Sequence, residues 1–284
     1  MRKFANATTA MNITLQDQLG TTHSFNRTPK RIVSIVPSQT ELMYDLGLEE
    51  SIAGITKFCV HPYHLKATKK IVGGTKKLHE DRVRELNPDI IIANKEENTQ
   101  EIVLALSQIC PVWVTDVRDL ESNARMISDF GTLFNCRTDA KKILDKLDFG
   151  ISDFKKFMEE KPVRKSAYFI WKDPYMAAGG DNFINEMMRL NKFANIYESR
   201  GRYPEVIVPK LRIQGDPELI FLSSEPYPFK DEDAFEIGRS THHAKTVFVD
   251  GEMFSWYGSR VLKALAYFRE LQLRLDEPEY AKGH

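Results

Sequence analysis

Aromatic, cationic and imidazole side chains follow the short β-branched runs in the first half of this sequence. Lys57, Phe58 and His61 follow one run, and Lys95 and Glu97 follow a later one. Lysine can neutralise an anionic group, neutral imidazole is a common metal ligand, and a flat aromatic ring can wall an apolar ligand. This combination favours recognition of a small molecule that has both charged and apolar parts.

The second half of the sequence repeats this combination with larger rings. Trp171 and Tyr175 follow one β-branched run, and Trp256, Tyr257 and Arg260 follow another. Rigid aromatic walls suit a flat, partly apolar macrocycle, and an arginine offers paired donors to an anionic rim. Core packing is the alternative for Trp171. Trp256 lies in a polar Ser-Trp-Tyr-Gly-Ser run, which favours a ligand contact over burial.

Metal and catalytic motifs are sparse. His61 is the candidate for direct metal ligation, with Cys59 two residues away, but no H-E-x-x-H or paired C-x-x-C motif accompanies it. Glu96 and Glu97 are adjacent carboxylates that would point apart, and no G-x-S-x-G or Cys-His nucleophile motif is present. We therefore expect a binding protein without an intrinsic cofactor, and not an enzyme. Pairing with Glu96 or Glu97 is an open alternative for the cations.

One β-branched run passes directly into a predicted helix. Residues 32–36 form an apolar strand, Pro37 breaks it, and Ser-Gln-Thr-Glu at 38–41 matches a capping box for a helix closed by Gly47. Ser38 is expected mainly as the helix cap, although the free N–H groups beside it could meet an anion. Gln39, in the same turn, is a second candidate contact.

Strand and helix patterns alternate along the rest of the chain, which is typical of βαβ units around a parallel sheet. Strands are predicted at residues 52–55, 89–93, 112–115, 167–171, 218–222 and 246–249, and helices at 81–86, 99–109, 120–134, 183–190, 231–237 and 259–275. Between the two series, residues 138–160 place apolar side chains at spacings of three or four, which predicts one long helix. Ligands of parallel sheets bind beyond the carboxyl ends of the strands, where the side chains above would lie.

The predicted fold class is therefore α/β, with two Rossmann-like lobes joined by a single long backbone helix. We expect an N-terminal segment at residues 1–28 that is partly flexible, a first lobe at 29–136, a linking helix at 137–162 and a second lobe at 163–284.

Composition excludes several classes of protein. The 284 residues are 42% hydrophobic and 28% charged, which excludes a disordered or fibrous chain. Forty Lys plus Arg balance forty Asp plus Glu, so no global field attracts nucleic acid. No apolar run reaches membrane-helix length, and three scattered cysteines suggest reduced thiols. Without a signal-like start we expect a cytoplasmic protein as written, or a periplasmic one if a signal was removed.

Three segments carry a family resemblance: residues 31–42 (RIVSIVPSQTEL), 87–93 (NPDIIIA) and 178–188 (AGGDNFINEMM). Their order resembles the class III substrate-binding proteins of ABC importers for cobalamin and ferric siderophores, the helical-backbone metal receptor superfamily. The resemblance covers about residues 29–275, and the Pro-Ser-x-Thr-Glu turn is most similar to the cobalamin branch. The signal peptide or lipoprotein cysteine of that family does not precede the first strand.

The resemblance implies that a metal chelate, such as a corrinoid or a ferric siderophore, is held in a cleft between two lobes with small hinge motion. The chain would be the substrate-binding component of an ABC importer, or a cytoplasmic carrier or sensor relative. An ABC permease is then the expected protein partner, with exposed acids such as Glu101 and Glu236 as docking candidates. A chelatase-like enzyme and a protein-interaction scaffold are the alternatives.

Overall fold

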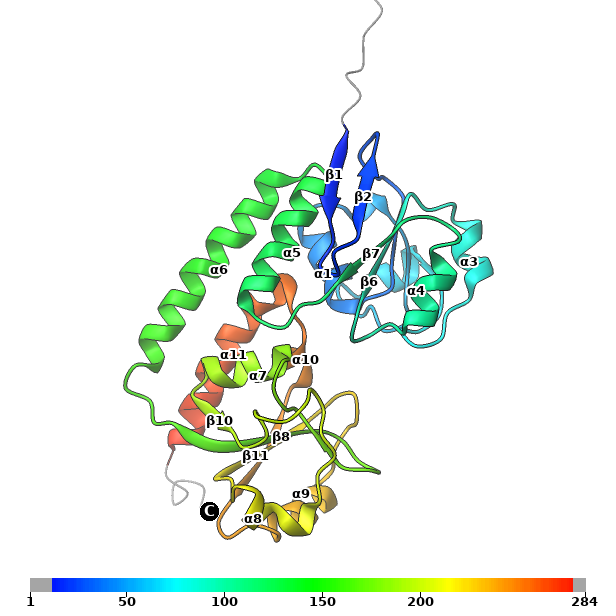
Figure 1. The fold of residues 1–284 in the computed structure, drawn as a ribbon. Helices are drawn as coiled ribbons and strands as arrows, with labels where there is room; N and C mark the ends of the chain where they lie inside the picture. The colour runs from blue at the N-terminus through cyan, green and yellow to red at the C-terminus, as the bar shows by residue number, and fades with distance from the viewer. Residues whose placement is uncertain (1–11, 278–284) are drawn as a thin grey trace, which may run out of the picture. The chain divides into compact units, whose positions relative to one another are not determined.

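The computed structural model describes residues 12–277 and divides them into two compact units (Figure 1). Unit 1 contains residues 12–116 and 122–144, and unit 2 contains residues 117–121 and 145–277. One division falls inside the long helix α6 (Arg137–Met158), which is the helix predicted to link the lobes. The domain boundaries proposed from the sequence stay a prediction.

Unit 1 is built on five parallel strands in the order β5-β4-β3-β6-β7. The strands are β3 (Ile32–Ser34), β4 (Ile52–Ile55), β5 (Lys70–Ile71), β6 (Ile90–Asn94) and β7 (Val112–Thr115). Their isoleucines and valines are largely buried, which suits a parallel sheet covered on both faces. All four strands predicted in this part are present, and the two-residue β5 was not predicted.

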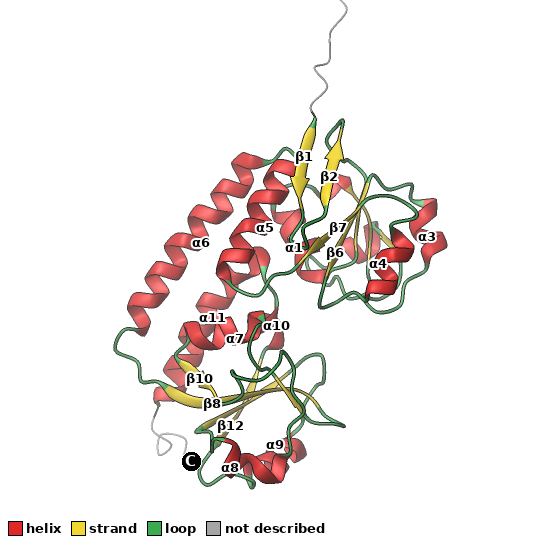
Figure 2. Ribbon diagram, viewed as in Figure 1, coloured by secondary structure: helices red, strands yellow, loops and turns green. Residues whose placement is uncertain are grey.

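Helices connect these strands, and Figure 2 shows the helices and strands of this unit in different colours. They are α1 (Pro37–Asp45), η1 (Glu49–Ser51), α2 (Leu65–Thr68), α3 (Glu80–Glu85), α4 (Gln100–Leu106) and α5 (Leu120–Leu133). Helix α1 ends at Asp45 and is closed as predicted by Gly47, which has a φ of +77°, and Leu48 N donates to Met43 O at 3.0 Å. The predicted capping box is wrong, because the N-cap is Val36 and Pro37 takes the first helical position.

An antiparallel hairpin precedes the first parallel strand and was not predicted. It consists of β1 (Ile13–Gln16) and β2 (Thr22–Phe25). The imidazole of His23 lies against Trp113 of β7, with ring centroids 5.3 Å apart. Each strand has only four residues, so its alternation is too short to stand out in the sequence. The predicted flexibility of residues 1–11 lies outside the described residues.

Unit 2 contains a second parallel sheet in the order β10-β8-β11-β12, with β9 antiparallel to β8. Its strands are β8 (Arg164–Trp171), β9 (Met176–Ala177), β10 (Phe193–Asn195), β11 (Leu219–Ser223) and β12 (Lys245–Val249). The three predicted strands are present, whereas β9 and β10 were missed. The two parallel sheets and the long helix confirm the predicted α/β fold class.

The helices of unit 2 are α7 (Phe183–Leu190), η2 (Val208–Lys210), α8 (Leu211–Gln214), α9 (Asp231–Gly238), α10 (Gly251–Ser255), η3 (Gly258–Arg260) and α11 (Val261–Asp276). Helix α7 has the predicted bounds, and Asn182 caps it by accepting a hydrogen bond from Asn185 N at 2.9 Å. Helix α10 occupies part of a segment that was predicted as a loop. Within the described range, no helix combines the length and apolar character needed to cross a membrane.

Candidate functional site

Each parallel sheet gathers its strand-end loops at one edge. In unit 1 these loops follow β3, β4, β6 and β7, and in unit 2 they follow β8, β11 and β12. We call them the unit 1 edge and the unit 2 edge. Most site residues predicted from the sequence lie on one of these two edges or in the first turn of the helix that follows, whereas Trp256, Tyr257 and Arg260 lie beyond the short helix α10 that follows β12.

The start of α1 forms the floor of the unit 1 edge. Ser38 is 2% exposed, and its Oγ has no hydrogen-bond partner among the described residues. Gln39 is fully buried and its Nε2 donates to Thr115 Oγ1 at 2.5 Å. Asn94 Nδ2 donates to the same hydroxyl at 3.1 Å. This buried polar network joins the ends of β6 and β7 to α1, so Ser38 and Gln39 lie beneath the surface of the edge.

An exposed aromatic ring and a lysine rise from the loop after β4. Phe58 is 48% exposed, and Lys57 Nζ lies 4.9 Å from its ring centroid, which is a cation–π contact. A Cβ atom at Gly74 would lie 3.1 Å from Phe58 Cε2, so the glycine leaves room for the ring. The structure therefore brings the predicted contacts Lys57 and Phe58 together.

The loop after β6 presents the second predicted lysine. Lys95 Nζ lies 3.0 Å from Asp116 Oδ2, and the lysine side chain is 51% exposed whereas that of Asp116 is 8% exposed. The ion pair of Lys95 is thus with Asp116 and not with Glu96 or Glu97, the alternative drawn from the sequence. Asn94 Oδ1 instead accepts from the backbone N of Glu96 at 2.8 Å and of Glu97 at 3.3 Å, so this side chain shapes the turn.

His61 lies partly buried in the loop after β4. Among residues 12–277, no group of three or more histidine, cysteine, aspartate or glutamate side chains is placed to hold a metal ion. The nearby Cys59 is buried against hydroxyls, with Sγ 3.1 Å from Thr40 Oγ1 and 3.3 Å from Thr56 Oγ1. Burial raises the pKa of this thiol, so it is a neutral packing group and not a thiolate ligand.

Trp171 is the exposed aromatic group of the unit 2 edge. It ends β8, is 39% exposed, and meets Tyr227 edge-on at a centroid distance of 5.8 Å. Tyr227 in turn packs on Phe229 at 4.8 Å. Core packing, the alternative considered for Trp171, accounts for the contact with Tyr227 and leaves the residue 39% exposed.

Lys172 and Tyr175 lie in the same loop as Trp171. Lys172 Nζ lies 2.6 Å from Asp233 Oδ1 and 3.2 Å from Glu236 Oε2, both on α9, and 5.5 Å from the Tyr175 ring centroid. Hydrogen bonding to Asp233 raises the pKa of Lys172 above its ordinary value. Burial raises the pKa of Tyr175 to about 12, so the phenol stays protonated at neutral pH.

Trp256, Tyr257 and Arg260 are buried, which corrects the expectation that their polar loop would expose them. Their exposed fractions are 9%, 3% and 3%, because α10 and η3 fold the segment onto unit 2. The Arg260 guanidinium lies 4.8 Å from the Trp256 ring centroid and donates to Glu252 Oε2 at 2.8 Å. The Tyr257 ring meets Phe183 edge-on at 5.8 Å.

Two groups at the unit 2 edge were not predicted. Glu225, after β11, accepts from Trp256 Nε1 at 2.9 Å and from Ser255 Oγ at 3.2 Å. Asp181, before α7, accepts from Arg118 Nη1 at 2.9 Å and from Arg202 Nε at 3.3 Å. The tendency of ligands to bind beyond the carboxyl ends of parallel strands could have found Glu225, because it lies in the loop after the predicted strand 218–222. Nothing in the local sequence links Asp181 to these two arginines, which lie 63 positions before it and 21 positions after it.

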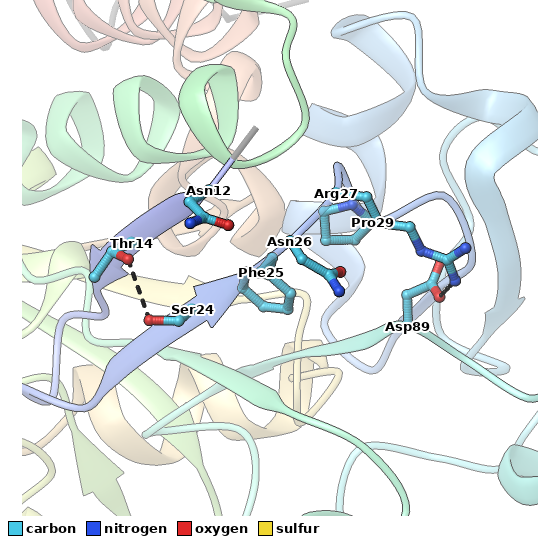
Figure 3. A pocket seen from close by; sticks show the side chains of 8 residues that line it. All are labelled: Asn12, Thr14, Ser24, Phe25, Asn26, Arg27, Pro29 and Asp89. Atoms are coloured by element: carbon cyan, nitrogen blue, oxygen red, sulfur yellow. Dashed lines mark hydrogen bonds and ion pairs between the residues drawn. The ribbon is translucent and has the colours of Figure 1, made fainter. Parts of the chain in front are cut away.

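Two cavities of the described residues lie away from these edges. One, of about 540 Å³, lies beside the hairpin in unit 1, and Figure 3 shows its lining by Asn12, Thr14, Ser24, Phe25, Asn26, Arg27, Pro29 and Asp89. The other, of about 560 Å³, is lined in unit 2 by Lys156, Phe157, Glu159, Glu160, Lys161, Pro162 and Asp276. Asp89 accepts hydrogen bonds from Arg27 and from two backbone N–H groups, so the carboxylate in the first cavity already has protein partners.

Comparison with known proteins gives the chain a family. It is 22% identical over 269 residues to the uncharacterised ABC transporter substrate-binding lipoprotein YvrC of Bacillus subtilis, covering 91% of this chain and 84% of that protein. It is 23% identical over 201 residues to a vitamin B12-binding protein of Vibrio campbellii, covering 70% and 72%. The solved structure of the petrobactin-binding protein YclQ from Bacillus subtilis has a TM-score of 0.74 at 19% identity, covering 94% and 100%. Residues 32–249 match the family model described as periplasmic binding protein, and the chain belongs to that family.

Proposed function

We propose that this chain binds a metal chelate, a corrinoid or a ferric siderophore, and that the strand-end edge of each unit, taken by itself, offers candidate contact side chains. The observation that carries the proposal is the pair of exposed aromatic groups at these edges, Phe58 at 48% and Trp171 at 39% exposure. Each ring lies at the carboxyl end of a parallel strand with a lysine in the same loop, Lys57 or Lys172, which is where ligands of parallel sheets bind. A macrocycle or a chelate with flat apolar parts and polar substituents has the matching chemistry.

The predicted contacts divide into two groups by exposure. Lys57, Phe58, His61, Lys95, Glu97, Trp171 and Tyr175 would touch the ligand, because each is at least partly exposed. Ser38, Gln39, Trp256, Tyr257 and Arg260 would support the edges from behind, because each is buried. The binding step is recognition without turnover, and the metal belongs to the ligand.

The role we propose is that of the substrate-binding component of an ABC importer, or of a carrier or sensor related to such components. The names of the relatives support it, since they include a substrate-binding lipoprotein, a vitamin B12-binding protein and a petrobactin-binding protein. An ABC permease is the proposed partner. Glu101 of α4 is exposed and Glu236 of α9 has a side chain 46% exposed, so both are accessible for docking.

Calorimetric titration of the purified chain tests this proposal. The panel is cyanocobalamin, cobinamide, haem, ferric petrobactin and ferric enterobactin, with the metal-free siderophores as matched controls. We expect saturable one-to-one binding of one class of chelate. Absence of binding by every compound overturns the proposal, and release of metal or breakdown of a compound with time supports the chelatase-like alternative instead.

A further inference from the structure

We propose that Glu225 is a positioning residue for ligand binding, whose carboxylate holds the Trp256 indole and thereby fixes the Arg260 side chain at the unit 2 edge. This role of Glu225 rests on the proposed function. It joins three segments of unit 2: the loop after β11, helix α10 and η3.

The first support is the geometry of the hydrogen bonds. One carboxylate oxygen, Glu225 Oε1, accepts from Trp256 Nε1 at 2.9 Å and from Ser255 Oγ at 3.2 Å. Two adjacent side chains of the α10 end are therefore held by one atom of a different loop. The Arg260 guanidinium lies 4.8 Å from the Trp256 ring centroid and donates to Glu252 Oε2 at 2.8 Å, so the indole and Glu252 together set where this arginine lies.

The second support is the space made for Glu225. A Cβ atom at Gly251 would lie 2.6 Å from Glu225 Cγ and 2.5 Å from Ser223 Oγ. Gly251 N donates to Ser224 Oγ at 3.0 Å, which ties the start of α10 to the same loop. Only the absence of a side chain at Gly251 lets the glutamate reach the indole.

The third support is electrostatic. Burial raises the pKa of the Glu225 carboxyl, and the nearby Glu252 raises it further. A partly desolvated carboxylate beside a second carboxylate is unfavourable for folding, unless its hydrogen bonds are satisfied. An apolar residue at this position would have a lower desolvation cost on folding. The hydrogen bonds that Glu225 makes to Trp256 and Ser255 therefore explain its presence better than a contribution to stability does.

The test uses the full chain labelled with 5-fluorotryptophan, whose three tryptophans give three ¹⁹F resonances, assigned with Trp171→Phe and Trp256→Phe. We expect Glu225→Ala to shift the Trp256 resonance and to raise the Kd of the chelate found by calorimetry by about tenfold or more. Glu225→Gln keeps an acceptor oxygen and should leave the resonance and the affinity close to wild type. Gly251→Ala should reproduce the effect of Glu225→Ala.

Two controls separate positioning from general damage. Glu218→Ala removes an exposed glutamate just before β11, at the opposite end of the same strand, and Gly201→Ala adds a methyl group where nothing lies within 4 Å. Both should leave the resonance and the affinity unchanged, and thermal unfolding checks that every variant is folded. An unshifted Trp256 resonance in Glu225→Ala overturns the proposal, as does a shifted resonance with wild-type affinity. If the wild-type chain binds no chelate, the proposed function fails first, whereas failure of the positioning role alone leaves wild-type binding intact.

Discussion

The carboxylate of Asp17 in the hairpin accepts a hydrogen bond from the backbone N of Val114 in β7 at 3.2 Å. The same carboxylate also accepts from the backbone N of Leu19 and of Thr21, and its Oδ2 lies 3.1 Å from His23 Nε2. Asp17 is 1% exposed, so this side chain, together with the contact of His23 with Trp113, attaches the hairpin to strand β7. A buried carboxylate with several donors is stabilising only while it stays ionised.

Asp17→Asn should lower the free energy of unfolding at pH 7 by about 1–3 kcal/mol, because an amide cannot accept from all these donors. Burial tends to raise the pKa of Asp17, but the hydrogen bonds outweigh it and the net pKa lies below 3.8. The contribution is therefore present above pH 3.8 and lost as the pH falls through the lowered pKa. Urea unfolding from pH 6 to pH 3 measures this, with exposed Asp45→Asn as control. Parallel pH profiles for wild type and Asp17→Asn would contradict it.

Ionisation of Asp129 in α5 should destabilise the folded chain, whereas ionisation of Asp17 stabilises it. Burial raises the pKa of the Asp129 carboxyl from 3.8 to about 6, although Arg125 Nε lies 3.6 Å from Oδ2. The folded state thus binds more protons than the unfolded state between these values, and stability falls as the pH rises from 4 to 6. Asp129→Asn should raise the free energy of unfolding at pH 7 by about 1–3 kcal/mol and change little at pH 4. Denaturant titration at both pH values measures this, with Asp148→Asn as the control. If Asp129→Asn is less stable than wild type at pH 7, the prediction is wrong.

Trp171→Ala should weaken binding of the chelate by about 10- to 100-fold, because a well-packed aromatic contact contributes roughly 1–3 kcal/mol. The side chain is 39% exposed, so its loss should cost little stability. Phe149→Ala is the matched control, since this aromatic ring of α6 is 76% exposed and lies away from both strand-end edges. Calorimetry on both variants is the measurement. Equal affinity for Trp171→Ala and wild type would remove this ring from the site.

Lys95→Gln should discriminate between ligands by their charge. We expect the Kd of an anionic ferric siderophore to rise about threefold to tenfold at low salt and the Kd of cyanocobalamin to change less. The lysine side chain is 51% exposed, so added salt should reduce the effect. Lys70→Gln changes an exposed lysine of β5 in the same sheet and is the control. The charge argument fails if both ligands respond equally and without salt dependence.

Local patterns were enough to predict most elements of the fold. The strands Ile52–Ile55 and Val112–Thr115 and the helix Phe183–Leu190 have the predicted bounds, because each has a continuous apolar run or stripe flanked by breaking or capping residues. The long helix Arg137–Met158 was predicted for the same reason. Since parallel strands place their carboxyl ends together, the sequence also indicated where functional side chains would gather.

The tertiary structure decided which of these side chains are accessible. Trp256 lies in a polar run, yet it is buried because α10 and η3 fold the segment onto unit 2, where Glu225, 31 positions earlier, accepts its indole N–H. Lys95 pairs with Asp116 of the neighbouring strand end and not with the glutamates next to it in sequence. Burial and pairing depend on residues that only the folded chain brings together, and a single sequence carries no local signal of such partners.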